Sequence, residues 1–579
     1  MRAIKIVVVG GVAAGMSTAA RARRLSEQAQ IIVIERSQYV SFANCGLPYH
    51  IGGVIKSREK LVLQTPESLA ETLNLDVRIA HEVIAIDTAK QMVRINNLND
   101  ETIYEQSYDK LVLCPGAKPI KPPLPGIDHP SIFTLRNIED MDKIKAALTA
   151  EIKHALVIGG GYIGVEMAEN LRHRNLEVAL VEISEQIVPP LDAEMARDLQ
   201  YHMEFHGVKL QLGDAVTGFL HENGQIVVSL KSGANIKTDL VVLAAGVRPD
   251  IDLIKNTAIE VGDRGGIRVN QFMQTSVENV YAAGDAVEVV DTVTQDYALI
   301  ALAGPANRQG RVIADHIFGR DSHYTSTQGT AIIKVFEMTA GATGASEKTL
   351  KKKGVPFNKI YLHPTGHASY YPGTNSMHIK LIYAPSNGKI LGAQAVGYDG
   401  VDKRIDVFAT AIRAGMTVYD LEQLELSYAP PYGSAKDAIN MAGFIAANQL
   451  HGDIDFWYAE HYPQVLQNAV LVDVRGKSEY EAWHIPEAIN IPLGQLRQQL
   501  TTLDKSKMIL LYCRVGFRSY LAHRILVMSG FGQVKTLAGG SKTFCSFHRT
   551  PLCTGRPGVP FVAHAEEKLA AKAKTNQCA

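Results

Sequence analysis

Two glycine-rich segments, each between a buried strand and a helix, constrain the fold of this chain most strongly. In the second, strand 155–158 runs into residues 159–164 (Gly-Gly-Gly-Tyr-Ile-Gly), helix 165–172 follows, and strand 178–181 ends at Glu182. The glycines permit a tight turn, close approach of a pyrophosphate and close packing of the helix on the strand. Because a carboxylate binds ribose hydroxyls and repels a 2′-phosphate, this unit is expected to bind NADH rather than NADPH.

The first glycine-rich segment follows the same plan with one departure. Strand 4–9 leads into residues 10–15 (Gly-Gly-Val-Ala-Ala-Gly), helix 16–25 follows, and strand 31–34 ends at Glu35. Val12 occupies the position of the middle glycine in the G-x-G-x-x-G pattern. A glycine turn that only packs a helix on a strand therefore stays open as an alternative for this segment. Two such units predict two bound nucleotides.

A third element indicates which unit binds which nucleotide. Residues 275–285 are an apolar strand ending in Gly-Asp, which resembles the third FAD-contacting motif of flavoproteins with two dinucleotide-binding domains. Segments 111–116 and 241–246 resemble the crossovers that flank an inserted NAD domain. The prediction is an FAD-binding domain split over 1–115 and 245–325, with an NAD-binding domain over 116–244. The residues expected to bind FAD or NADH are Gly10, Gly11, Val12, Ala13, Gly15, Glu35, Arg36, Asn44, Gly116, Gly159, Gly161, Tyr162, Gly164, Glu182, Gly246, Gly284, Asp285 and Ala303.

Cys45 lies shortly after the first unit and has no second cysteine at C-x-x-C spacing. Flavoenzymes that reduce disulfides with an internal dithiol need two close cysteines. A lone thiol beside a flavin must find its second sulfur on a substrate, or become a sulfenic acid. A small buried hydrophobic residue is the alternative interpretation of this cysteine.

Four longer stretches carry a family resemblance: residues 41–49, 367–373, 401–406 and 427–437. Through them, residues 1 to about 447 resemble the single-cysteine branch of the pyridine nucleotide–disulfide oxidoreductases, most closely the coenzyme A-disulfide reductases. The resemblance implies FAD, a homodimer, and a Cys45 that holds coenzyme A (CoA) as a mixed disulfide. NADH would reduce FAD, and FAD the mixed disulfide. We expect the pKa of Cys45 to be lowered beside the flavin and a helix N-terminus.

The CoA site is predicted from helical spacing and from the resemblance. Ser17, Arg21 and Arg24 lie at i, i+4 and i+7, on one face of the first helix. Two guanidinium groups there suit the phosphates of CoA, although a solvated basic face is the alternative. The positions that match CoA-binding positions of the family are Ser17, Arg21, Arg24, Ser41, Asn44, Arg308 and Lys436.

Tyr370 and Tyr428 are the predicted acids. Reductive cleavage of a disulfide expels a thiolate, which a tyrosine hydroxyl can protonate. The resemblance implies that these tyrosines reach the active site from the other subunit; core packing is the alternative. Adjacent Tyr370 and Tyr371 would point to opposite faces if extended, so the family motif selects Tyr370. Alternating stretches and a helix at 403–414 predict an α+β dimerisation domain over 326–447.

The C-terminal third resembles a rhodanese domain at residues 470–475, Glu479 and residues 484–492, with Trp483 and Glu487 at usual glycine positions. A buried strand, 508–512, ends at Cys513, and a loop then leads into a helix. Backbone N–H groups of such a loop stabilise a thiolate or persulfide anion.

Phosphatases also have a cysteine that faces a loop of backbone N–H groups, and the length of the loop distinguishes this site from theirs. Their loops are C-x5-R, whereas Cys513 to Arg518 is the C-x4-R spacing of sulfur transfer. Arg514 and Arg518 are expected to hold an anionic sulfur donor, with plain surface charge as the alternative. A degenerate structural domain is the alternative for the whole region. The predicted boundaries are a linker at 448–465, the rhodanese-like domain at 466–550 and a tail at 551–579.

Composition excludes several classes of function. The 59 basic and 59 acidic residues balance, which gives no global case for nucleic acid or an anionic membrane. No segment approaches the roughly 18 apolar residues of a membrane-spanning helix, and no signal peptide is expected. Six scattered cysteines form no secreted disulfide framework, so a cytoplasmic location is expected. No metal site is expected.

The fusion suggests the substrate. A persulfide-carrying domain joined to a CoA-thiol reductase predicts NADH-dependent reduction of CoA persulfide, polysulfide and CoA disulfide, with Cys513 carrying sulfur to CoA and Cys45 receiving it. One alternative is an NADH peroxidase or oxidase with a Cys45 sulfenic acid, but those enzymes have a histidine in the first glycine loop and residues 10–15 have none. The other is a sulfur-relay or redox-sensing flavoprotein with slow turnover.

Overall fold

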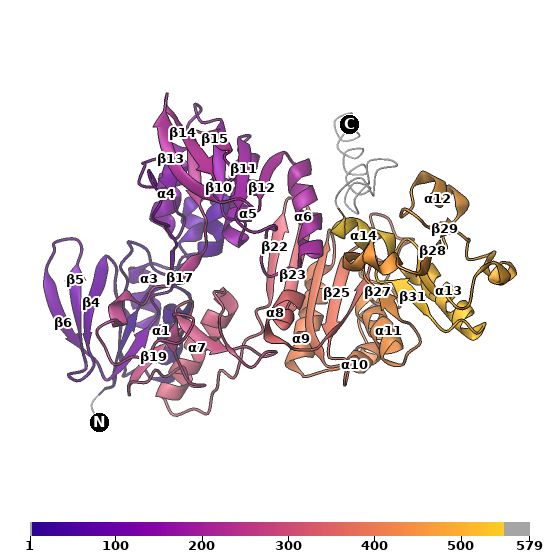
Figure 1. The fold of residues 1–579 in the computed structure, drawn as a ribbon. Helices are drawn as coiled ribbons and strands as arrows, with labels where there is room; N and C mark the ends of the chain where they lie inside the picture. Colours follow the sequence, from indigo (N-terminus) through magenta and orange to yellow (C-terminus); the bar gives the residue numbers. More distant parts are fainter. Residues whose placement is uncertain (1–2, 549–579) are drawn as a thin grey trace. The chain divides into compact units, whose positions relative to one another are not determined.

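The structure is a computed structural model that describes residues 3–548. The described chain divides into two compact units, residues 3–184 with 207–329 and residues 185–206 with 330–548 (Figure 1). Each unit is described separately. The predicted tail at 551–579, with Cys553 and Cys578, lies outside the described residues.

The first unit contains a five-stranded parallel sheet with the strand order β19-β7-β1-β2-β3. Residues 6–8 of its central strand are fully buried, as expected of an apolar strand covered on both faces. Helices α1 and α7 pack against each other. The bounds are β1 Lys5–Val9, α1 Ala13–Leu25, β2 Gln30–Ile34, β3 Asp76–Arg78, β7 Lys110–Leu113, β19 Val280–Ala282 and α7 Ala303–Ile317.

A second parallel sheet in this unit has the order β12-β11-β10-β16-β9. Each sheet has a strand–glycine loop–helix–strand connection, which confirms the two Rossmann-like folds. The bounds are β9 Ile132–Phe133, α4 Ile138–Ala147, β10 His154–Ile158, α5 Tyr162–His173, β11 Glu177–Glu182, β12 Val208–Leu212 and β16 Leu240–Leu243.

Smaller elements complete the first unit. The sheets β4-β5-β6 and β13-β14-β15 are antiparallel, and the sheet β18-β20-β21 is mixed. Strand β8 pairs with β17 where the chain passes between the nucleotide-binding folds. The bounds are α2 Leu47–Ile51, α3 Pro66–Leu73, β4 His81–Asp87, β5 Met92–Asn97, β6 Ile103–Ser107, β8 Ala117–Pro119, β13 Val216–Glu222, β14 Gln225–Leu230, β15 Asn235–Thr238, β17 Val247–Pro249, β18 Ile267–Arg268, β20 Val287–Val290 and β21 Tyr297–Leu299.

The second unit begins with an antiparallel sheet of order β22-β23-β26-β25-β24, as the alternating sequence pattern predicts. Helix α6, which lies within the segment predicted as the NAD-binding domain, packs on this sheet. The bounds are α6 Ala193–Phe205, β22 Ala331–Val335, β23 Met338–Gly344, α8 Glu347–Lys353, β24 Asn358–Leu362, β25 His378–Tyr383, β26 Ile390–Gly397, α9 Val401–Arg413, α10 Val418–Gln423 and α11 Ala438–Leu450.

The second unit ends with a parallel sheet of order β27-β31-β30-β28-β29, with hydrophobic clusters that contain alternate residues of β30. β27 lies within the segment predicted as a linker and pairs with β31. The bounds are β27 Phe456–Trp457, β28 Ala469–Asp473, α12 Lys477–Ala482, β29 Ile489–Asn490, β30 Met508–Tyr512, α13 Phe517–Met528, β31 Val534–Leu537 and α14 Gly540–Phe547.

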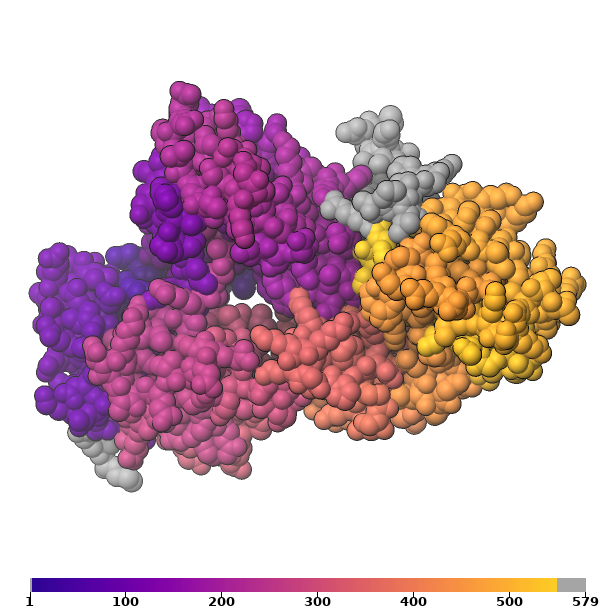
Figure 2. Space-filling model, viewed as in Figure 1, coloured from indigo at the N-terminus to yellow at the C-terminus, as the bar shows by residue number. Residues whose placement is uncertain are grey.

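Polar contacts join the two sheets of the second unit. The Thr543 hydroxyl lies 2.9 Å from Nε2 of His363, and Ser546 donates to Asp198 at 3.2 Å. The hydroxyl of Tyr458 donates to the Lys359 carbonyl at 3.0 Å. The surface of residues 450–548 is continuous with that of residues 330–450 in Figure 2. These contacts explain why both sheets form one compact unit.

Among residues 3–548, no helix combines the length and the apolar character that crossing a membrane requires.

Candidate active site

The first glycine loop is shaped so that side chains are excluded. Gly10 has φ +100°, and a Cβ there would lie 2.1 Å from the carbonyl oxygen of Cys114; a Cβ on Gly15 would lie 1.8 Å from that of Gly10. The Gly11 amide donates to Glu35 Oε2 at 2.7 Å, which places the acid of the motif beside the loop. The loop and its acid fit the pyrophosphate and ribose of a dinucleotide.

The second glycine loop repeats this construction. A Cβ on Gly159, whose φ is +109°, would lie 2.2 Å from the Ala244 carbonyl oxygen, and one on Gly164 would lie 1.9 Å from that of Gly159. A Cβ on Gly161 would meet no heavy atom within 4 Å apart from its chain neighbours, which leaves space for a pyrophosphate. The Gly160 amide donates to Glu182 Oε2 at 2.6 Å. The loop fits the NADH predicted for it.

The other predicted cofactor residues of the first unit lie near strand ends and helix starts. Gly284 (φ +84°) donates its amide to Gln309 at 2.8 Å, and burial raises the pKa of the adjacent Asp285. Arg36 pairs with Asp250 at 3.4 Å. Gly116 and Gly246 follow β7 and β16 with φ of +70° and +98°, Val12 caps α1, and Ala13, Tyr162 and Ala303 begin α1, α5 and α7.

Gly10, Gly116 and Gly284 thus follow the carboxyl ends of β1, β7 and β19, and Glu35 that of β2, where ligands bind in open parallel sheets.

Cys45 is exposed and lies in a short 3-10 turn, Asn44–Gly46, directly before α2. Helix α2 packs against α4 and α5, the helix that follows the second glycine loop. This packing is close, because a Cβ on Gly52 would lie 2.1 Å from Oδ1 of Asn170. The fold therefore fixes the cysteine turn against the predicted NAD-binding helix.

The expected lowering of the Cys45 pKa is wrong for the protein chain by itself. Partial burial, then the carboxylates of Glu166 and Asp285, raise the pKa of this thiol. Burial and negative charge both disfavour a thiolate. The helix terminus next to Cys45 is apparent from the sequence, whereas these carboxylates approach the thiol only in the folded chain.

Glu166 is a site residue that the sequence analysis missed. It lies in the first turns of α5, and burial raises its pKa to about 7. The Tyr49 hydroxyl donates to its Oε1 at 3.3 Å, and Tyr49 belongs to the cysteine motif. Its position, two residues after the last motif glycine, was the available signal. A carboxyl that titrates near neutrality beside a thiol is a typical feature of functional sites.

The predicted CoA residues on α1 have different surroundings. Arg21 is 13% exposed and pairs with Asp315 of α7 at 2.6 Å, so its guanidinium is neutralised within the fold. Ser17 donates to Asn307, also of α7. Arg24 is exposed, as is Arg308, which lies over the Tyr324 ring at 5.7 Å. Ser41 has a left-handed backbone with φ +48°, Asn44 is exposed in the cysteine turn, and Lys436 is exposed in the second unit.

The two predicted acids lie together in the second unit. The hydroxyls of Tyr370 and Tyr428 are 2.9 Å apart, and their side chains are 73% and 48% exposed. Tyr370 and Tyr371 form a turn rather than an extended strand, closed by a hydrogen bond from the Tyr371 amide to Ala368. Tyr371 packs against the His367 ring, so the two rings still diverge. The pair lies on the surface, so core packing does not account for it.

Cys513 lies at the end of β30, almost fully buried at the base of its loop. The Gly516 amide donates to its Sγ at 3.2 Å, and the Ser519 hydroxyl lies 3.5 Å from the same atom. Beneath the loop, the Ser541 amide donates to the Cys513 carbonyl at 2.8 Å. Donors aimed at sulfur stabilise a negative charge on it.

The two arginines of this loop differ in their partners. Arg518 forms a bidentate ion pair with Glu479, in which its two terminal nitrogens lie 2.6 and 2.8 Å from the two carboxylate oxygens. This pair lowers the pKa of the Glu479 carboxyl to about 2. Arg514 is exposed. In the chain alone Arg518 therefore orders the loop against α12, and Arg514 is the arginine available to an anion.

Three family models match the chain. Residues 4–310 match the pyridine nucleotide-disulphide oxidoreductase model, residues 330–438 match the dimerisation domain of that family, and residues 460–546 match the rhodanese-like domain.

Similar proteins agree with these matches. A coenzyme A disulfide reductase of Staphylococcus aureus is 36% identical over 444 residues, which is 76% of this chain and 99% of the relative. The crystal structure of reduced Bacillus anthracis CoADR-RHD has a TM-score of 0.92 at 49% identity, covering 94% of this chain and 98% of that one. An NAD-dependent persulfide reductase from A. fulgidus has a TM-score of 0.88 at 34% identity, covering 93% and 100%.

Proposed function

Because the chain belongs to the pyridine nucleotide-disulphide oxidoreductase family and carries a rhodanese-like domain, we propose that it uses NADH to reduce CoA persulfide, polysulfide and CoA disulfide. The observation that carries the proposal is the exposed Cys45 thiol beside two glycine loops that fit dinucleotides. The same chain holds Cys513, whose sulfur accepts a hydrogen bond from the Gly516 amide. We place the enzyme in the cytoplasm as a homodimer.

Cys45 exchanges sulfur with the substrate. Its thiolate attacks the CoA-bound sulfur of CoA persulfide, forms Cys45–S–S–CoA and releases HS⁻. With CoA disulfide the same attack releases a CoA thiolate. FAD, when bound, supplies two-electron transfer from NADH to the mixed disulfide. One NADH then converts CoA persulfide to CoA thiol and HS⁻ with release of NAD⁺. With CoA disulfide, one NADH and one proton yield NAD⁺ and two CoA thiols.

The residues around the thiols bind and protonate. Exposed Arg24 and Arg308 bind the phosphates of CoA, while Arg21 stays paired with Asp315 and orients α1 on α7. The hydrogen-bonded Tyr370 and Tyr428 protonate the departing thiolate. The exposure of this pair supports its presentation to a partner subunit, as the family dimerisation domain suggests.

Cys513 supplies sulfur. As a persulfide, it offers its outer sulfur to a CoA thiolate, which leaves a Cys513 thiolate stabilised by the Gly516 amide and forms CoA persulfide. Placing both activities on one chain raises the effective concentration of one site for the other.

The proposal is tested by mass spectrometry of the intact protein as isolated and after NADH. Wild type is expected to carry one CoA by disulfide, lost on reduction, and Cys45→Ser to carry none. Cys513→Ser is the matched control, which keeps the CoA adduct and loses the sulfane sulfur loaded from a persulfide donor. A CoA adduct on Cys45→Ser, or a Cys45 sulfinic acid without CoA, would contradict the proposal.

A further inference from the structure

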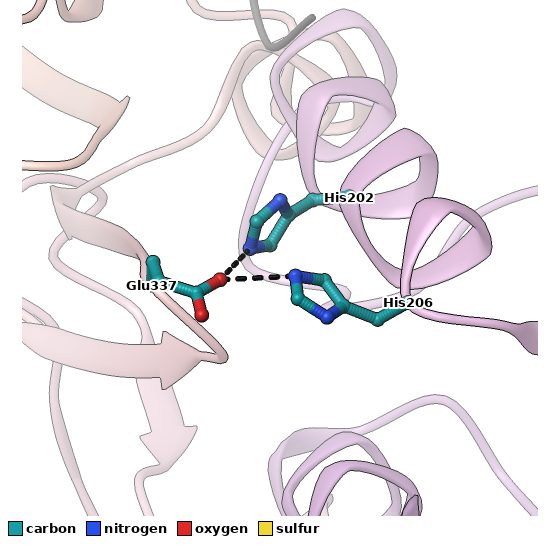
Figure 3. Close-up of side chains that lie close together, drawn as sticks. All are labelled: His202, His206 and Glu337. Atoms are coloured by element: carbon teal, nitrogen blue, oxygen red, sulfur yellow. Dashed lines mark ion pairs between the residues drawn. The ribbon is translucent and has the colours of Figure 1, made fainter. Parts of the chain in front are cut away.

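A pair of histidines on helix α6 converges with a glutamate from the turn between β22 and β23. His202 and His206 lie at i and i+4, so their rings project from the same face (Figure 3). Their Nε2 atoms lie 3.3 and 2.9 Å from one atom, Oε2 of Glu337. The ligand atoms of the three residues all lie within 4.8 Å of one another. All three residues belong to the second unit.

The surroundings hold both rings in place. The His206 ring is stacked on Phe336 at 4.0 Å with an interplanar angle of 9°, and the edge of Tyr398 meets the His202 ring at 5.9 Å. The His202 side chain is fully buried, that of His206 is 25% exposed, and that of Glu337 is 50% exposed. The cluster is therefore rigid on the helix side and open to solvent on the glutamate side.

We infer that His202, His206 and Glu337 bind a divalent zinc ion. Two imidazoles and a carboxylate are a ligand set that zinc takes, with water in the fourth position. Ligand atoms about 2.0–2.1 Å from a tetrahedral zinc lie about 3.4 Å apart. The separation of His202 Nε2 from Glu337 Oε2, 3.3 Å, already has this value. The separation of His206 Nε2 from the same oxygen is shorter, 2.9 Å, and the half-exposed Glu337 side chain would move away from His206 to admit the ion.

A second cluster in the same unit, made of three carboxylates, is not a comparable metal site. The carboxylates of Asp192, Glu194 and Glu347 also converge, but the Lys380 ammonium lies among them at 2.9, 2.5 and 2.7 Å. That cluster already contains its own cation. At His202, His206 and Glu337, the two partners of the carboxylate are imidazoles, which become metal ligands in their neutral form.

A zinc ion with these ligands would link helix α6, which carries both histidines, to the β22–β23 turn, which carries Glu337. The helix and the turn are far apart in the chain, and a shared ion would add to the ion pairs of Glu337 and to the packing of α6 against β22, β23 and β26. Because Glu337 is distant in sequence from the i, i+4 histidines, the three residues form no contiguous metal-binding motif, and the sequence led to the expectation of no metal site. A bound ion would stabilise the folded state by RT ln(1 + [Zn²⁺]/Kd), so the gain rises with the logarithm of the free zinc concentration.

The test is equilibrium dialysis of the holoenzyme against Zn²⁺ at pH 7.5, with metal analysis and X-ray absorption of the bound ion. We expect one zinc per chain with nitrogen and oxygen ligands only. His206→Ala and Glu337→Gln are each expected to weaken this zinc at least tenfold. Zinc is also expected to raise the melting temperature of wild type by a few degrees, but not that of Glu337→Gln. Glu337→Gln, at a half-exposed position, keeps the fold testable.

His461→Ala is the matched control, because His461 is an exposed histidine of the same unit. It is expected to bind zinc as wild type does. FAD content and melting in EDTA check that each variant is folded. Sulfur ligands on the bound zinc would place it on cysteines and overturn the inference. Equal zinc binding by wild type and Glu337→Gln would leave the cluster as an ion pair only, and would equally overturn it.

Discussion

At the scale of single residues, the carboxyl of Glu166 sets the charge around Cys45. Its pKa of about 7 means that its charge changes within the neutral range, and its carboxylate raises the pKa of the Cys45 thiol. In protein that NADH has reduced and freed of CoA, Glu166→Gln is therefore expected to move the midpoint of Cys45 alkylation by iodoacetamide to lower pH. Glu27→Gln, at an exposed position on the first unit, is the control. An unchanged midpoint in Glu166→Gln would show that the two groups do not interact.

The same carboxyl makes stability depend on pH. Burial raises the Glu166 pKa above its ordinary value of 4.5, so between about pH 4.5 and 7 the folded protein retains a proton that the unfolded chain releases. Folding stability attributable to this group therefore falls as pH rises through that window. Urea denaturation from pH 5 to 8 is expected to show this decline in wild type and a shallower one in Glu166→Gln. Parallel curves would contradict the assignment.

Glu487 carries local backbone strain. Its φ is +69°, in the left-handed region that favours glycine, and it replaces a usual rhodanese glycine. Trp483, the other replacement, is extended and unstrained. Glu487→Gly is expected to stabilise the protein by up to about 1 kcal/mol, because glycine relieves the Cβ contact. Trp483→Gly should destabilise it, since it gains no backbone relief and loses the contact of the indole with Arg475. Chemical denaturation measures both; destabilisation by Glu487→Gly would refute the strain argument.

At the scale of elements, Lys380 is the buried cation that joins β25 to α6 and α8. Although burial alone would lower its pKa, the carboxylates of Glu194, Asp192 and Glu347 raise it well above its ordinary value. Lys380→Met would leave three buried carboxylates without their shared partner, and is expected to cost about 3–5 kcal/mol of unfolding free energy.

Lys351→Met is the matched control for this prediction. Lys351 contacts the same Glu347 at 2.6 Å but is 62% exposed, so its loss should cost less than about 1 kcal/mol. Urea denaturation of the two variants measures the difference. Equal losses would show that burial does not determine the strength of these pairs.

The sequence predicted the elements whose geometry is local. Gly10, Gly159 and their neighbours require backbone conformations and close approaches that only glycine allows, so the motif implies the loop. The buried strands and the i, i+4, i+7 spacing of α1 could also be predicted, because they too depend only on residues close together in the sequence. The pairing of Arg21 with Asp315 was not, because the acid comes from a helix almost three hundred residues away.

At the scale of the whole molecule, the features that could not be predicted from the sequence are contacts between side chains that are distant in the chain. The Tyr370–Tyr428 hydrogen bond, the carboxylates beside Cys45 and the packing of α6 on the second unit all depend on tertiary contacts. Motifs and family resemblance were enough to predict which residues form the site. The ionisation of these residues could not be predicted in this way, because it depends on tertiary contacts. Local motifs therefore indicated the chemistry, while the fold determines its electrostatics.

The central claim is that NADH reduces a CoA-bound sulfur through Cys45. Its most direct test is anaerobic oxidation of NADH with CoA persulfide and with CoA disulfide in parallel, with sulfide quantified. We expect one sulfide per NADH from CoA persulfide, rapid turnover in wild type and Cys513→Ser, and no turnover in Cys45→Ser. NADH oxidation that requires oxygen, or that continues without Cys45, would contradict it.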